Sequence, residues 1–195
     1  PSNPARTVAN IIIDMAKYSS RNLIGVAHKD TTDDLMGAFN AKIAVIEPWD
    51  KLMWKTMSGL TVTSFHTKAE VETSFEGNKI NALIKKGDEK MFSDGLTLAG
   101  GDYKFLDITR TQYYVEGLIT EGLTNLFKNS RVAYTSGGIQ EVKSSIEMAC
   151  QIAVDNGALM EPMLVDGATR NGYVVEVPNF STIPTIDKTN RVLKN

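Results

Sequence analysis

Two long amphipathic helices are the feature of this sequence that most constrains its fold. Residues 107–128 and 136–156 both carry apolar side chains at intervals of three and four, which is the repeat of one helix face. In the second segment, Ile139, Val142 and Cys150 belong to this stripe. Gly157 follows directly and is the residue type that most often ends a helix in the left-handed conformation. We therefore expect these two helices to form the rigid framework of the fold.

The residues before position 107 predict shorter elements of both kinds. Thr67 is expected to cap a short helix, because Glu70 stands three residues later and completes a capping box. Another helix is expected to begin at a cap formed by Thr32 or Asp33. The expected helices cover residues 7–17, 31–46 and 67–75, the expected strands cover 22–27, 52–57, 80–84 and 90–92, and a β-rich stretch covers 96–105.

Turn signals and the last forty residues complete the predicted order. Gly87-Asp88 is expected to join two strands as a hairpin, and Ser58-Gly59 is expected to form another turn. Residues 172–178 alternate in a strand-like pattern, and the segment after them is polar and interrupted by proline. The sequence therefore predicts an α+β fold, α/β-like in its order, in which two long helices pack on a small mixed sheet.

Composition excludes several classes of function. The 195 residues suit one domain or a domain and a half, and the net charge is -2. The longest basic run is the pair Lys85-Lys86, so we expect no nucleic-acid partner. No apolar stretch is long enough to span a bilayer, so we expect no membrane partner either. Cys150 is the single cysteine, and its position predicts core packing.

Candidate chemistry has a simpler structural interpretation at each position. Thr135-Ser-Gly-Gly before a helix could bind an anion, but it lacks a phosphate-loop pattern and fits a capped turn. The carboxylates Asp94, Asp102 and Asp107 fit solvated turns and a helix start. His66 has no helical histidine or cysteine partner for a metal. We therefore expect no catalytic, cofactor-binding or metal-binding residues, and a protein that is not an enzyme.

Exposed aromatic side chains are a second kind of candidate. Tyr113 and Tyr114 are adjacent on a predicted helix, so one of them should face away from the core. Trp49 lies just before the strand predicted over 52–57, and Trp54 lies within it. These side chains either anchor contacts between subunits or complete the core of the domain itself, and the sequence leaves both interpretations open.

Several stretches of the second half resemble one family of proteins. Tyr103-Lys-Phe-Leu-Asp-Ile-Thr-Arg-Thr leads into the first long helix, and Ala133-Tyr-Thr-Ser-Gly-Gly-Ile opens the second. Ala153-Val-Asp-Asn-Gly closes that helix, and Gly172-Tyr-Val-Val-Glu-Val-Pro follows. In this order the segments resemble the core and C-terminal region of contractile phage tail sheath proteins. Ala133 is a departure, since many relatives carry proline there.

The resemblance implies a fold and a role. It implies a tail sheath core domain over residues 1–180, either whole or lacking part of its N-terminal side, and the start of a C-terminal arm or linker over 181–195. Such a subunit polymerises around the tail tube and contracts to drive the tube through the host envelope, without a cofactor. Its partners are identical subunits, the tube protein, the baseplate and the tail terminator, and it belongs to the virion tail after assembly in the host cytoplasm.

Charged residues of the long helices and their junction are the candidate contacts between subunits. We expect this set to comprise Arg110, Glu116, Glu121, Lys128, Arg131, Glu141 and Lys143. Two alternatives remain open for the function. One is a baseplate or tail-terminator protein of the same machine. The other is a small α/β hydrolase, which a deep pocket lined by His66 and two carboxylates would favour.

Overall fold

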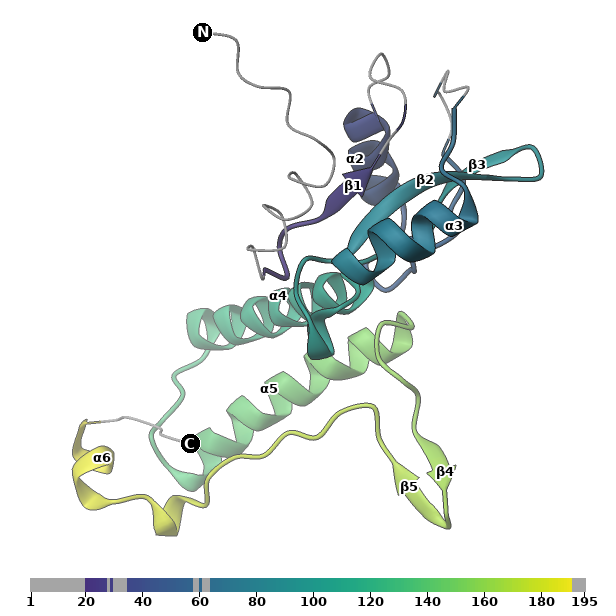
Figure 1. Ribbon diagram of the computed structural model, residues 1–195. Coiled ribbons are helices and arrows are strands. Elements are labelled where there is room, and N and C mark those ends of the chain that lie inside the picture. Colours follow the sequence, from purple (N-terminus) through teal and green to yellow (C-terminus); the bar gives the residue numbers. More distant parts are fainter. Residues whose placement is uncertain (1–19, 28, 30–34, 58–59, 61–63, 191–195) are drawn as a thin grey trace, which may run out of the picture. The chain divides into compact units, whose positions relative to one another are not determined.

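A computed structural model describes residues 20–27, 29, 35–57, 60 and 64–190 of the chain. It mixes helices with two small sheets and is 47% helical, so the predicted α+β class is confirmed. The chain divides into two compact units between Thr111 and Gln112, inside helix α4 (Leu106–Asn129). We call them the first unit and the second unit and describe each by itself (Figure 1).

The first unit contains a three-stranded mixed sheet. Strand β1 (Gly25–Ala27) pairs in parallel with β2 (Ile80–Lys86), and β2 pairs antiparallel with β3 (Glu89–Phe92). The β2–β3 hairpin turns at the predicted Gly87-Asp88, where Gly87 has a φ of 62°. A positive φ of this kind carries little steric cost at glycine, so the dipeptide fixes the position of the turn.

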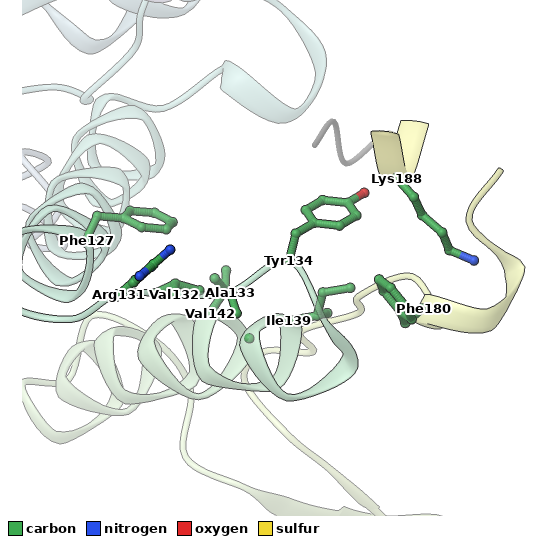
Figure 2. A pocket seen from close by; sticks show the side chains of 10 residues that line it. Phe127, Arg131, Val132, Ala133, Tyr134, Ile139, Val142, Phe180 and Lys188 are labelled. Atoms are coloured by element: carbon green, nitrogen blue, oxygen red, sulfur yellow. The ribbon is translucent and has the colours of Figure 1, made fainter. Parts of the chain in front are cut away.

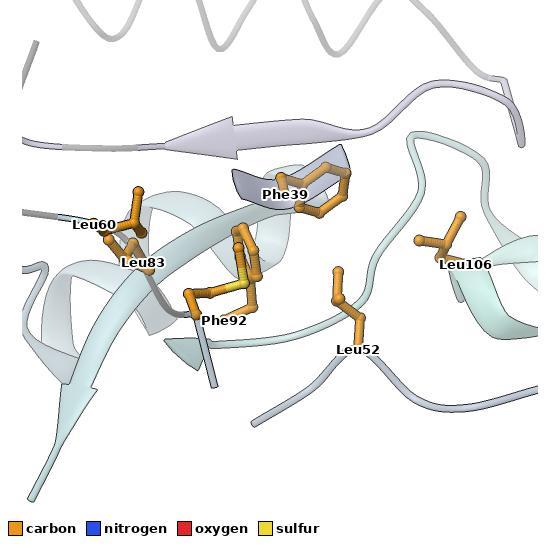
Figure 3. Packing of buried hydrophobic residues seen from close by; sticks show 7 residues of the cluster. Phe39, Leu52, Leu60, Leu83, Phe92 and Leu106 are labelled. Carbon is orange, nitrogen blue, oxygen red and sulfur yellow. The ribbon is translucent and has the colours of Figure 1, made fainter. Parts of the chain in front are cut away.

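The core of the first unit lies between this sheet and helix α2 (Leu35–Val45). Phe39 of α2 packs edge-on against Phe92 of β3, with ring centroids 5.0 Å apart and planes at 81°. Leu52, Leu83 and Leu106 belong to the same buried cluster, which Figure 3 shows. Because Leu106 is the first residue of α4, the start of that helix is part of this core.

The helix predicted from the Thr67 capping box is confirmed. Thr67 Oγ1 accepts the Glu70 N–H at 3.3 Å, and the Glu70 carboxylate accepts the Thr67 N–H at 2.7 Å. The box begins α3 (Lys68–Glu70), which continues as the π-helical turn η1 (Val71–Phe75) and the 3-10 turn η2 (Glu76–Asn78). This run places Val71 and Phe75 in a second buried cluster.

A buried asparagine joins three segments of the first unit. Asn81 of β2 is fully buried, and its amide donates to Gly25 O at 3.0 Å and to Leu96 O at 2.8 Å. Its side-chain oxygen accepts the Leu96 N–H at 2.7 Å. The segment that contains Leu96 is bonded on its opposite edge to residues 104–106. The Asn81 side chain therefore bonds to Leu96 in the position that a neighbouring strand would otherwise occupy.

Both long helices form close to the predicted limits. Helix α4 runs over Leu106–Asn129 and α5 over Ser136–Asp155, each within one residue of the expectation. Gly157 has a φ of 80° and provides the left-handed stop after α5. A 3-10 turn, η3 (Gly101–Tyr103), precedes α4.

The residues after α5 form small elements. Strands β4 (Met163–Val165) and β5 (Ala168–Arg170) make an antiparallel hairpin. A 3-10 turn, η4 (Phe180–Thr182), and helix α6 (Thr185–Asn190) follow it, so residues 181–190 have helical structure of their own.

Two predicted strands, over residues 52–57 and 172–178, are wrong, and the β-rich stretch predicted over 96–105 is confirmed only in part. Residues 52–57 contain a turn in which Trp54 has a φ of 63°, and they contact β3 through a bridge from Thr56 to Met91 and a hydrogen bond from the Trp54 N–H to Phe92 O at 3.1 Å. The β-rich stretch over 96–105 is reduced to one bridge between Leu96 and Phe105. Residues 172–178 are extended but belong to no strand.

Some predictions fall outside the described residues. These are the helix over 7–17, the caps at Thr32 and Asp33, and the turn at Ser58-Gly59. None of the described helices combines the length and apolar character needed to cross a membrane.

Candidate subunit-contact surface

Arg110 is the candidate contact residue that lies in the first unit. It donates to the backbone oxygens of Ile43 at 2.9 Å, Ile46 at 3.0 Å and Glu47 at 3.1 Å. These oxygens belong to the last turn of α2 and the residues after it, so the guanidinium caps the negative end of that helix. Burial lowers the pKa of Arg110, while Asp50 and other carboxylates nearby oppose that effect. The bonds give Arg110 a structural role within its own unit.

The candidates on α4 lie on the surface of the second unit. Glu116, Glu121 and Lys128 are exposed. Glu116 accepts a hydrogen bond from Gln112 Nε2 at 2.6 Å, one helical turn before it. The three side chains are therefore accessible, but they are spread along the helix and do not form one cluster with a common partner.

Of the three further candidates, Arg131 follows the end of α4, and Glu141 and Lys143 belong to α5. Arg131 and Glu141 line a groove between the two helices, where Gly122 allows close approach. A Cβ built at Gly122 would lie 3.3 Å from Ser145 Oγ of α5. Lys143 lies half-buried on α5 and pairs with Glu147 at 3.5 Å. The structure thus brings part of the predicted set together at the junction of the long helices.

The junction also holds an open cavity of about 680 Å³, which we call the junction pocket. Figure 2 shows aromatic and basic side chains around it. Its main lining residues come from α4, the loop after it, α5, η4 and α6, and they are Phe127, Arg131, Tyr134, Ile139, Phe180 and Lys188.

Aromatic contacts shape the pocket. Tyr134 packs edge-on against Phe180, with ring centroids 6.0 Å apart. Lys188 Nζ lies 4.8 Å from the centroid of the Phe180 ring, within cation–π range. Phe127 is 59% exposed, so an apolar surface remains open to solvent at one side. Among the described residues that line the pocket, two are basic and none is acidic.

A capped turn positions the floor of the pocket. Thr135 Oγ1 accepts the Gly138 N–H at 3.2 Å and caps α5, as the structural interpretation of this segment predicted. A Cβ at Gly138 would lie 1.8 Å from Ala133 O, so the loop passes too close for any other residue. Glycine is therefore required here for close approach of the backbone.

An extended segment, residues 172–178, runs back along α5. Tyr173 Oη donates to Gln151 Oε1 at 3.4 Å, and residues 175–178 line a cavity of about 490 Å³ with Gln140 and Lys143. Burial alternates along the segment, and Val174 is 78% exposed. In the part of the chain that the structure describes, the backbone of 172–178 makes no hydrogen bond to another segment.

The β4–β5 hairpin extends from the other end of α5. Its two turn residues are Asp166 and Gly167, with φ values of 52° and 77°, as a type I′ turn requires. Leu164 is 74% exposed and Met163 is 47% exposed. At the base, a Cβ at Gly172 would lie 2.0 Å from Met160 O, so the returning chain passes closely behind the hairpin.

A pocket beside His66 matches the composition that would favour a hydrolase. It measures about 540 Å³, and Glu72 and Asp94 also line it. Both ring nitrogens of His66 are buried, with Nδ1 3.7 Å from the Glu70 carboxylate and the ring packed on Phe75 at 4.6 Å. A general base must reach the proton that it removes, so this arrangement does not favour acid–base catalysis.

The other candidates for chemistry take structural positions. Cys150 is buried, and desolvation raises the pKa of its thiol, with Glu147 adding to the effect. Asp107 lies in the first turn of α4, and Asp102 lies in η3. Among the described residues, no group of three or more His, Cys, Asp or Glu side chains is placed to hold a metal ion.

The predicted aromatic contacts divide between the two interpretations. Tyr113 is 43% exposed and Trp54 is 58% exposed, so both side chains reach the surface. The Tyr114 hydroxyl accepts a hydrogen bond from Asn156 Nδ2 at 2.7 Å, which ties it to the end of α5. Lys86 Nζ lies 3.8 Å from the Trp54 ring centroid.

Sequence reasoning missed the hairpin and two walls of the junction pocket. Asp166-Gly167 between short β-prone runs was a local signal for the hairpin. Phe180 and Lys188 carried no local signal, because the fold brings them to the junction from a distant part of the sequence.

No family model matches the sequence, and no curated protein matches it.

Proposed function

We propose that this chain is a subunit of the contractile tail sheath of a phage or of a related injection machine. It polymerises around the tail tube in the virion tail after assembly in the host cytoplasm. The observation that carries the proposal is the extended segment over residues 172–178, whose backbone is unpaired among the described residues. The resemblance of the sequence of residues 103–191 to sheath proteins supports the same function.

An unpaired extended segment is a site for association. Its N–H and C=O groups can pair with the edge of a sheet in another chain, which gives several hydrogen bonds at once. The alternating burial of residues 173–177 leaves one row of side chains on α5 and the other row free. We therefore propose that a strand of a neighbouring copy pairs with the backbone of this segment.

Repetition of such a contact produces a filament. A contact between different surfaces of identical subunits continues indefinitely unless its rotation closes a ring. Helices α4 and α5 supply rigid elements of 24 and 20 residues. Contraction would then repack contacts between subunits, since packed interfaces tend to have discrete arrangements. Identical subunits, the tube protein, the baseplate and the tail terminator are the partners, and neither a cofactor nor bond cleavage is involved.

Proline substitution in the extended segment tests the proposal. In Val174→Pro/Val175→Pro, each of the two edges loses a backbone donor, because successive N–H groups point to opposite edges. The monomer makes no backbone hydrogen bond there, so its thermal unfolding should change little. The control Val174→Thr/Val175→Thr keeps both donors and the β-branched shape.

Negative-stain microscopy of the full chain provides the decisive observation. The unmodified chain and the threonine variant should form hollow striated tubes, and the proline variant should form no tubes. Monodisperse particles from the unmodified chain would contradict a sheath subunit. Closed rings of fixed size would also contradict it and would favour the tail-terminator alternative.

A further inference from the structure

The structure points to a second contact between copies, in which the β4–β5 hairpin of one copy inserts Leu164 into the junction pocket of the next. This contact rests on the proposed polymer-forming function and deepens it by naming a pair of complementary surfaces. The pocket and the hairpin both belong to the second unit.

The junction pocket is suited to an apolar side chain accompanied by a carboxylate. Phe127, Tyr134 and Phe180 provide aromatic walls, and Arg131 and Lys188 provide positive charge. Within the described residues, neither of these two cations forms an ion pair. Aromatic and arginine side chains around a pocket are typical of the residues that dominate binding at protein interfaces.

The hairpin has the complementary chemistry. Leu164 is its most exposed apolar side chain, and Met160 and Met163 are 49% and 47% exposed beside it. Asp166 lies two residues from Leu164, at the turn, and Glu161 precedes β4. An isolated two-stranded hairpin is marginally stable in water, so a surface that covers it would stabilise it.

The two surfaces lie at opposite ends of α5. Gly138 and Ile139 at the start of the helix line the pocket, whereas the hairpin follows its end at Asp155. The 20 residues of α5 span about 30 Å at 1.5 Å per residue. Hairpin and pocket are therefore separated within one copy, and a contact between them joins one copy to the next. Such a head-to-tail contact extends a row of subunits in one direction.

Complementary variants test this contact. Leu164→Asp removes the apolar side chain from the hairpin, and Arg131→Glu/Lys188→Glu reverses the charge of the pocket. Both are made in the Val174→Pro/Val175→Pro chain, so that pairing through the extended segment does not contribute. Leu164→Met and Lys188→Arg are matched controls that keep the apolar and basic character of each surface.

Sedimentation velocity at several protein concentrations measures the association. The proline chain with both surfaces intact should form short rows that grow with concentration. The hairpin variant and the pocket variant should each be monomeric, with association weakened by about 30-fold or more, as for an interface hot spot. A one-to-one mixture should form a discrete dimer, because one chain supplies the intact pocket and the other supplies the intact hairpin.

A second variant tests the charge. Asp166→Asn keeps the type I′ turn, for which asparagine is well suited, and removes the carboxylate. Its association should be several-fold weaker than that of the parent at low salt, and the difference should shrink as salt rises.

Three outcomes would overturn the contact. They are a mixture that stays monomeric, single variants that associate like the parent, and a parent proline chain that stays monomeric at every concentration. Failure of the sheath function is recognised separately, as the absence of tubes from the unmodified chain. Rows and mixed dimers without tubes would leave the contact in place and remove the sheath.

Discussion

Replacement of Asn81 by leucine should destabilise the first unit more than any other change of similar volume in its sheet. The Asn81 side chain makes three hydrogen bonds to backbone groups of Gly25 and Leu96. Asn81 is fully buried and Leu96 is 1% exposed, so water cannot replace these bonds without opening the unit. Leucine has nearly the same size but neither donates nor accepts a hydrogen bond.

The expected magnitude follows from the groups left without partners. The N–H and C=O of Leu96 would both lose the amide of Asn81. A buried polar group left unsatisfied costs about 1–3 kcal/mol, so two groups cost about 4 kcal/mol. Typical stabilities of small domains are about 5–15 kcal/mol, so this loss is a large part of the total.

Tryptophan fluorescence during urea unfolding measures the effect. Both tryptophans of the chain, Trp49 and Trp54, lie in the first unit, so the signal reports on that unit. With a slope of about 2 kcal/mol per molar urea, the midpoint should fall by about 2 M. The control Lys85→Leu changes an exposed position of the same strand and should shift the free energy of unfolding by less than about 1 kcal/mol. An Asn81→Leu midpoint within about 0.3 M of the unmodified chain would refute the reasoning.

Two further predictions concern caps and close approaches. Two hydrogen bonds lower the pKa of Glu70 from 4.5 to about 2. The larger effect comes from the Thr67 N–H and the smaller from the Lys29 side chain. A depressed folded-state pKa gives stability that is complete above the unfolded value and is lost as pH falls. The melting temperature of Glu70→Gln should therefore lie below that of the unmodified chain at pH 7. This difference in melting temperature should narrow as pH falls from 4.5 to about 2. A difference that does not depend on pH would contradict this role of Glu70. In the second unit, Gly138→Ala should cost about 1–3 kcal/mol, because its Cβ would lie 1.8 Å from Ala133 O. A Cβ at its neighbour Gly137 would make only an ordinary contact with Thr135 Oγ1 at 3.8 Å, so alanine should be accepted there without loss, and equal thermal shifts for the two variants would contradict the prediction.

Features encoded within a few residues were predictable from the sequence. The Thr67 capping box, the Gly87-Asp88 turn and the Gly157 helix stop all formed as expected. Each depends on the conformational preference of one residue or on a hydrogen bond within one helical turn. The periodicity of α4 and α5 extends over many residues, so their limits were also predictable.

Features that depend on a distant partner were not predictable. Residues 172–178 have the alternation of a strand, but alternation does not supply a neighbouring strand, and here the segment lies on α5 instead. Trp54 breaks the strand predicted over 52–57 with a φ of 63°, which few non-glycine residues adopt. The bonds of Asn81 join residues up to 56 positions apart, and no local pattern encodes that distance.

The candidate contact residues show the same limit. A sequence marks charge on a helix, but it does not show whether the charge caps a carbonyl or faces solvent. Arg110 binds the end of α2, whereas Arg131 lines an open pocket. Surface residues such as Glu116 and Lys128 are accessible, and their predicted role in contacts between subunits stays a prediction.

The burial of Cys150 has a practical consequence for measuring the second unit. This thiol is the single cysteine of the chain, and its raised pKa keeps it protonated and unreactive while the helix around it is folded. Its rate of alkylation therefore reports how often α5 opens, without any engineered label. Together with the tryptophans of the first unit, it gives each unit of the chain an intrinsic probe of its own unfolding.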